Sequence, residues 1–334
     1  MHRAITLTVL LTIAIPIGQA DHNSDRYRKQ CADIIAAKGQ ADEGRRLWNL
    51  FEANWEYRMI AMPESATWRG YPGQNHRWSD LSMEAIADGK ESARQTLKAI
   101  LSFDRAKLTD ANQLNYDLFR RDAEMAIESQ QFPAEFLVLN QMDGLPRDVP
   151  SMIAMMASAK TKDYEDILAR LGGIPALVDQ TIALLQEGLR RGIVPPKVPL
   201  RTVADQVSGQ VHIGPMTTPM LSKFKIFPDT IPAAEQTRLT EAAKVVYADE
   251  VRPALKRLHL FLRDEYVPNC RTTVGRSALP NGRAWYNHQI KHYTTTTLGA
   301  DEIHNIGLRE VNRIRSEMEA IRKQVGFEGD LYAF

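Results

Sequence analysis

Residues 301–325, DEIHNIGLREVNRIRSEMEAIRKQV, are the most regular segment of this 334-residue sequence. Asp301 and Glu302 place negative charge at its start, where the dipole of an α-helix favours it. Apolar side chains then recur at alternating intervals of three and four residues, the spacing that brings them to one side of a helix. They are Val311, Ile314, Met318, Ile321 and Val325. The segment therefore predicts one long amphipathic helix.

The same period extends over most of the chain. Leu47, Phe51 and Trp55 repeat at intervals of four, with Trp48 and Leu50 widening the stripe. Further helices are predicted at about 82–103, at 109–130 with Leu114, Leu118 and Met125 on one face, at 163–189 with a break at Gly172-Gly173, and from Pro232 to about Tyr266 with a kink or split at Pro253.

Other stretches lack that period. The segment PESATWRGYPGQNHRWSD, residues 63–80, is too rich in turn-forming residues to predict a regular element. Residues 191–196 predict a loop, 198–229 only short helices, and 279–282 a turn. No strand-like alternation of any length occurs, so the predicted fold class is all-α with at most one small hairpin.

The N-terminus has the pattern of a secretory leader. Met1-His2-Arg3 precedes an apolar run from Ala4 to Gly18, and small residues at Gly18 and Ala20 suit cleavage before Asp21. The run is short for a membrane span and contains Pro16, so an uncleaved anchor is the less favoured alternative. The sequence predicts a signal peptide at 1–20, a helical domain at 21–334 with no stable membrane span, and a periplasmic or secreted location.

Composition excludes some classes of function. The formal net charge is +1, and no basic stripe with interleaved aromatic residues gives a footprint for nucleic acid. The sequence has two cysteines, Cys31 and Cys270, too few for a disulfide framework. They could pair in an oxidising compartment or stay as two separate buried thiols. The oligomeric state is left open.

Familiar catalytic patterns are missing from the sequence. None of the eight histidines is followed by Glu, so the zinc-peptidase pattern His-Glu-x-x-His is absent. His288 and His292, four residues apart, could share a helix face, but a third metal ligand is not evident. There is no Gly-x-Ser-x-Gly elbow and no glycine-rich phosphate loop. The sequence itself predicts no metal site and no catalytic residue.

Several strings nevertheless resemble one bacterial family. They are Pro63–Gly70, Arg170-Leu171, Lys291–Thr296 and above all Glu302–Met318. Together they are similar to the family catalogued as "domain of unknown function 885". The resemblance implies an exported, all-helical protein of the zinc-metallopeptidase type, in which two helical halves face each other across a substrate channel. It implies zinc for the full-length family.

The sequence departs from that family in length. Members run to nearly twice this length, and their His-Glu and Pro-Gly-His-His zinc motifs lie in the second half. No position here matches those motifs, so no zinc ligand is carried over. The chain is expected to correspond to the N-terminal portion alone, with an apolar face of the helix that starts at Asp301 left uncovered.

The four consecutive threonines at 294–297, the Thr tract, are the best candidate for contact with substrate. Their hydroxyls and neighbouring polar groups could hydrogen-bond an extended peptide, and the alternative is a helix-capping role. The expected function is the substrate-channel half of a hydrolase acting on short peptides, not catalytic alone. A non-catalytic binding or scaffold protein is the alternative. The candidate substrate-binding residues are Arg283, Tyr286, His292, Thr294 and Thr295.

Overall fold

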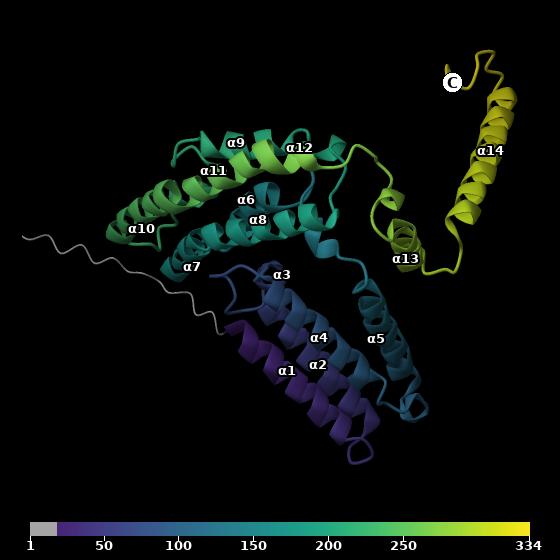
Figure 1. Ribbon diagram of the computed structural model, residues 1–334, viewed down its shortest axis with the longest axis horizontal. Helices are drawn as coiled ribbons and strands as arrows, with labels where there is room; N and C mark the ends of the chain where they lie inside the picture. The colour runs from purple at the N-terminus through teal and green to yellow at the C-terminus, as the bar shows by residue number, and fades with distance from the viewer. Residues whose placement is uncertain (1–18) are drawn as a thin grey trace, which may run out of the picture. The chain divides into compact units, whose positions relative to one another are not determined.

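The computed structural model describes residues 19–334, and Figure 1 shows its helices. The chain forms two compact units, one ending at Arg271 and the other covering Thr272–Phe334. The leader predicted at 1–20 lies outside the described residues, except for Gln19 and Ala20, which begin helix α1. Residues 19–334 contain no strand, only an isolated bridge between Pro196 and Arg271, so the all-α prediction is confirmed.

Four helices build the first part of the larger unit: α1 (Gln19–Ala36), α2 (Glu43–Ala61), α4 (Met83–Ile100) and α5 (Asp110–Ser129). Side chains cap three of them. Asp42, Ser82 and Thr109 each accept a hydrogen bond from the backbone N–H three residues later, as N-cap residues do. Helix α1 packs against α2 and α4, and the three lie side by side in Figure 1.

Only part of the apolar face predicted for α2 and for α5 is buried. On α2, Leu47 and Leu50 are fully buried, whereas Trp48 and Trp55 are about half exposed, at 50% and 48%. On α5, Tyr116, Ala123 and Met125 are buried while Leu114 and Leu118 are exposed. The apolar stripe on each helix is wider than the side that its neighbours cover, because α5 packs mainly on α4 and only a little on α2.

The segment 63–80, predicted to lack a regular element, contains a short helix. Helix α3 (Pro63–Trp68) begins with Pro63 in the first turn, where a missing N–H costs nothing. Residues 69–82 then run without regular structure up to α4. The prediction was wrong for α3 because a helix of six residues is too short to show a period, and contacts with α7 hold it.

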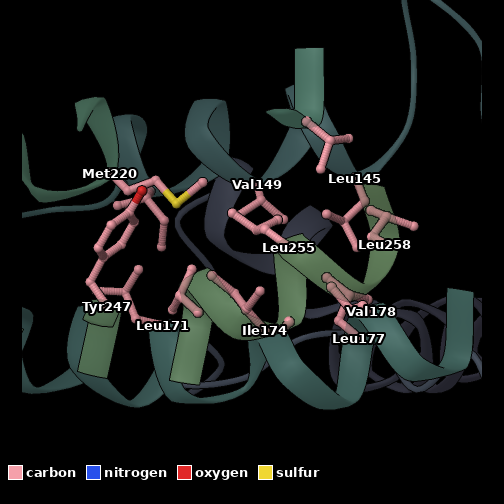
Figure 2. Close-up of a cluster of buried hydrophobic side chains, with 14 of the residues drawn as sticks. Leu145, Val149, Leu171, Ile174, Leu177, Val178, Met220, Tyr247, Leu255 and Leu258 are labelled. Carbon is pink, nitrogen blue, oxygen red and sulfur yellow. The ribbon is translucent and has the colours of Figure 1, made fainter. Parts of the chain in front are cut away.

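Six further helices complete the larger unit around a second core (Figure 2). The break predicted at Gly172-Gly173 is confirmed, since it separates α7 from α8. Together these two helices are apolar and long enough for a membrane span, but Ile167, Leu171 and Ile174 are fully buried in the core. The six helices are α6 (Leu145–Met155), α7 (Thr161–Gly172), α8 (Ile174–Arg191), α9 (Val203–Val211), α10 (Ala233–Val246) and α11 (Arg252–Phe261), followed by the single turn α12 (Val267–Asn269).

Helices α10, α11 and α12 form one continuous helix with two wide turns of π type, at Tyr247–Val251 and Leu262–Tyr266. Each wide turn ends two residues before a proline, Pro253 or Pro268. A proline ring clashes with the carbonyl four residues earlier, and a wider turn moves that carbonyl away. Of the kink or split predicted at Pro253, the split is therefore wrong: the helix passes both prolines by widening.

The wide turns also keep one row of side chains in the core. The row from Leu239 to Cys270 takes 31 residues in eight steps, about 3.9 residues a step, against 3.6 for an α-helix. Each π turn accommodates about one extra residue. The other 29 residues then give about 3.6 a step, so the row stays on one side. Its members are Leu239, Ala243, Tyr247, Val251, Leu255, Leu258, Leu262, Tyr266 and Cys270, all buried.

The smaller unit holds α13 (Gly282–Thr294) and α14 (Ala300–Gln324). The Gly299 N–H donates to the Glu302 carboxylate at 2.8 Å, and this hydrogen bond caps the start of α14. Glu302 is one of the two acidic residues that the sequence places in the first turn. No residue of α14 is buried, and the apolar row from Val311 to Val325 is 42% to 60% exposed. The uncovered apolar face expected for this helix is therefore present.

The two cysteines are free, and each is buried in a different core of the larger unit. Burial raises the pKa of both thiols, that of Cys270 to about 12. Because the thiolate is the reactive form, we expect Cys270 to react with an aromatic disulfide reagent roughly a thousandfold more slowly than an ordinary cysteine at pH 8.

A thiol titration checks this expectation. The native protein should release almost no chromophore, and the protein in concentrated denaturant should release that of two thiols per chain. A count of zero in denaturant would mean that Cys31 and Cys270 pair in solution.

Candidate functional site

The N-terminal end of α13 is fixed by close packing within the smaller unit. Asn281 adopts a left-handed conformation with φ 54°, and Gly282 follows against the backbone of a short turn at 276–278. A Cβ at Gly282 would meet the Arg276 carbonyl oxygen at 2.1 Å, so only glycine fits there. The Arg276 guanidinium lies 4.8 Å from the ring centre of Trp285, which is 2% exposed. These contacts anchor one side of α13.

The predicted substrate-binding residues on α13 fall on two sides. Arg283, Tyr286 and Thr294 are separated by three and eight residues, so the helical repeat places them along one exposed side. His292 follows Trp285 by seven residues, or two turns, and shares the anchored side. The helical repeat therefore aligns three of the five residues along one side of α13, over about 16 Å of its length, and places His292 on another side.

The Thr tract ends α13. The Thr294 hydroxyl donates to the Ile290 carbonyl at 2.8 Å and accepts from the Thr296 N–H at 3.2 Å. Thr295 adopts a left-handed conformation with φ 56°, and its N–H donates to the Lys291 carbonyl at 3.1 Å. A β-branched residue is uncommon in that conformation. The geometry matches the capping alternative for Thr294, while Thr295 holds a strained turn in solvent.

Zinc, which the family resemblance implies, needs three or four ligand side chains around one point. His288 and His292 are one turn apart on α13, and His304 is exposed on α14. Within residues 19–334, no three side chains of the ligand types come close enough to hold an ion together. The described residues do not fit a zinc centre by themselves, so we derive no chemical step through one.

A second feature, in the larger unit, was not predicted. Arg170 on α7 is fully buried, and its guanidinium organises the segment that contains α3. It donates to the Arg77 carbonyl at 2.8 and 3.0 Å, to the Gln74 carbonyl at 3.0 Å and to the Thr67 hydroxyl at 2.9 Å. In return, the Trp78 indole N–H donates to the Arg170 carbonyl at 2.7 Å. Two strings that carried the family resemblance thus meet in space.

Among the residues that the structure describes, no carboxylate hydrogen-bonds the Arg170 guanidinium directly. Burial lowers the pKa of Arg170 to about 10, and the charges of Glu64 and Asp166 oppose that shift. The group therefore stays protonated at neutral pH, and backbone carbonyls stabilise its charge. The Trp78 ring lies 5.1 Å from the guanidinium carbon and covers it. This arrangement is a rigid support rather than a reactive centre.

The segment supported by Arg170 presents the indole ring of Trp68 to solvent. Trp68 is 69% exposed, and the Arg69 guanidinium lies 5.9 Å from the ring centre of Trp55 on α2.

The sequence contains one signal for the buried position of Arg170. Arg170 lies between Ile167 and Leu171 on the apolar side of its helix, where a cation requires buried partners.

Comparisons with known proteins place the chain among helical relatives. No curated protein matches it. Its fold is similar to a crystal structure of a protein from Colwellia psychrerythraea described as a candidate lipoprotein, with a TM-score of 0.73 and 18% sequence identity. The similarity covers 91% of this chain and 52% of that one, so the chain spans about half the length of this relative.

A protein-family model matches the sequence more directly. The match runs over residues 63–334, which include both the Arg170-supported segment and the α13–α14 region. It confirms the family that the sequence strings indicated, and the family carries no assigned function. The chain belongs to the family described as bacterial protein of unknown function, DUF885.

Proposed function

We propose that this chain is the substrate-binding half of a hydrolase that acts on short peptides outside the cytoplasm. One observation carries the proposal: nearly all of this chain superimposes on about half of a longer helical relative. In this proposal, the groups that cleave the peptide belong to a part of the fold outside the described residues. The leader pattern at 1–20 and the description of the relative as a candidate lipoprotein support the location.

The exposed side of α13 is the proposed contact surface. Arg283 can form paired hydrogen bonds with the terminal carboxylate of a short peptide. Tyr286, 48% exposed, can donate its hydroxyl to a peptide carbonyl, and Thr295 carries a hydroxyl just beyond the helix end. The Thr294 hydroxyl is already engaged, because it donates to the Ile290 carbonyl and accepts from the Thr296 N–H, so it shapes the helix end beside these groups. These groups recognise a peptide end by charge and hydrogen bonds.

Peptide binding tests the proposal. The purified chain without its leader should bind unblocked tripeptides and tetrapeptides in calorimetric titration and should not cleave them. Arg283→Gln should weaken binding about tenfold, or about 1.4 kcal/mol, because a charge-assisted pair is lost. His292→Gln, on the other side of α13, should change binding less than twofold.

Arg309→Gln is the matched control, since it makes the same substitution at an exposed position on α14. It should leave the affinity unchanged. Failure of the wild-type chain to bind any of the peptides would refute the proposed function. An equal loss of peptide affinity in Arg283→Gln and Arg309→Gln would refute the proposed surface.

A further inference from the structure

The exposed apolar row of α14 has the pattern of a coiled-coil seam. In a seven-residue repeat lettered a to g, Val311, Met318 and Val325 fall at a, and Ile314 and Ile321 at d. All five side chains are at least 42% exposed. A row with this spacing buries its side chains when a second helix lies along it.

The charges beside the row indicate which helix that is. Position g holds Glu310 and Glu317, and position e holds Arg315 and Arg322. When two parallel helices pair, each g residue faces the e residue that is five positions further along the partner. Glu310 would face Arg315 of the second copy, and Glu317 its Arg322. An antiparallel pair would oppose like charges instead, Glu to Glu and Arg to Arg.

Contacts within the chain leave the first of these pairs available. Arg322 is held by Glu319 and donates to the carbonyls of Phe327 and Gly329 at 2.7 and 2.6 Å, so it is largely engaged at the end of its own helix. Glu310 bonds Arg313 at 2.9 Å on the surface, a contact of low energy that leaves oxygen atoms free. Arg315 is exposed. The pair Glu310 and Arg315 should therefore set the register.

We propose that α14 forms a parallel two-stranded coiled coil with α14 of a second copy of this chain. The apolar row supplies the attraction, and the matched charges select a copy of the same helix in the same direction. The proposal is independent of the peptide-binding surface, because it uses α14 and not the exposed side of α13.

Sedimentation of the chain without its leader tests the association. The wild-type protein should change from one chain to two with rising concentration. Ile314→Asp should keep its helical circular dichroism and stay monomeric. A mass of one chain at every concentration would overturn the proposal. That result is expected if another segment of the same chain covers the apolar row. A dimer that survives Ile314→Asp, or an assembly of more than two chains, would also overturn the proposal.

Charge exchange tests the register. Glu310→Arg and Arg315→Glu should each raise the dissociation constant of the dimer about tenfold, because each converts two attractive pairs per dimer into repulsive ones. An equal mixture of the two variants should recover wild-type affinity, because the opposed charges match again. Arg309→Glu, on the outer side of α14, is the control and should change nothing. Absence of recovery in the mixture would overturn the proposed pairing.

Cross-linking tests the direction. Val311→Cys should form a disulfide between copies under mild oxidation, because a-position residues of parallel helices lie opposite each other. The native cysteines are buried and do not compete. A dimer in which Val311→Cys fails to cross-link would contradict the parallel arrangement.

Discussion

Replacing Arg170 with methionine is expected to lower the free energy of unfolding of the larger unit by about 4 kcal/mol. Methionine fills a similar volume but donates no hydrogen bond. The carbonyls of Gln74 and Arg77 and the Thr67 hydroxyl would then lose a buried partner. Each unsatisfied group costs about 1–3 kcal/mol, which makes the loss larger than most single substitutions produce. Urea unfolding followed by circular dichroism measures it.

Two further variants identify the cause. Arg190→Met makes the same change at an exposed position on α8 and should cost less than about 1 kcal/mol. Arg170→Lys keeps the charge but lacks the planar fork of donors, so it should recover less than half of the loss. Limited proteolysis of the Arg170→Met protein should cut first within 69–82. If the Met variant is as stable as the wild type, Arg170 does not support this segment.

The second large effect concerns the core around α11. Leu255 is fully buried and belongs to the same cluster of core side chains as Val149 of α6 (Figure 2). Leu255→Ala should lower the free energy of unfolding by about 3 kcal/mol, because it removes apolar contacts and leaves a cavity in a packed core. Leu260→Ala makes the same substitution on the same helix at a residue that is 38% exposed.

The difference in the free energy of unfolding between these two leucine variants identifies the buried side of α11. Leu260→Ala should lower the free energy of unfolding by less than about 1 kcal/mol. The midpoints of urea unfolding give both values when the dependence on urea concentration is the same. Equal losses of stability would mean that the side of α11 assigned to the core is wrong.

Periodicity predicted the helices because most of them bury one continuous side. The break between α7 and α8 was predictable from Gly172-Gly173, which interrupts a long apolar run. Helix α14 was predicted almost to the residue, although it buries nothing, because its pattern is suited to a partner helix. The spacing of apolar residues indicates which side of a helix is apolar, but it does not indicate whether another element covers that side.

Features that depend on distant residues were not predictable in this way. Helix α3 is held by Arg170, about 100 positions later in the sequence. Leu114 and Leu118 were predicted on one apolar face with Met125, yet α5 buries Tyr116 and Ala123 with Met125 and leaves both leucines exposed. Which of several apolar residues a helix buries depends on its neighbours, and a single sequence does not contain that geometry.

The candidate site shows the same limit. Sequence identified the polar groups around α13 but could not separate their sides. His292 shares the side of buried Trp285, and that assignment needs the packing of Trp285 against Arg276. Thr294 and Thr295 were predictable as residues of a turn, because threonine hydroxyls bond nearby backbone groups.

The two wide turns before Pro253 and Pro268 restrict how this protein can change in length. A residue gained or lost in the straight part of α11 would rotate everything after it by about 100° and take Tyr266 out of the core. A residue lost inside either wide turn would keep the buried rows before and after that turn on the same side of the helix. It would also bring a backbone carbonyl into a clash with the proline that follows. Single-residue deletions in this helix should therefore be tolerated at these two turns, and only when the neighbouring proline changes with them.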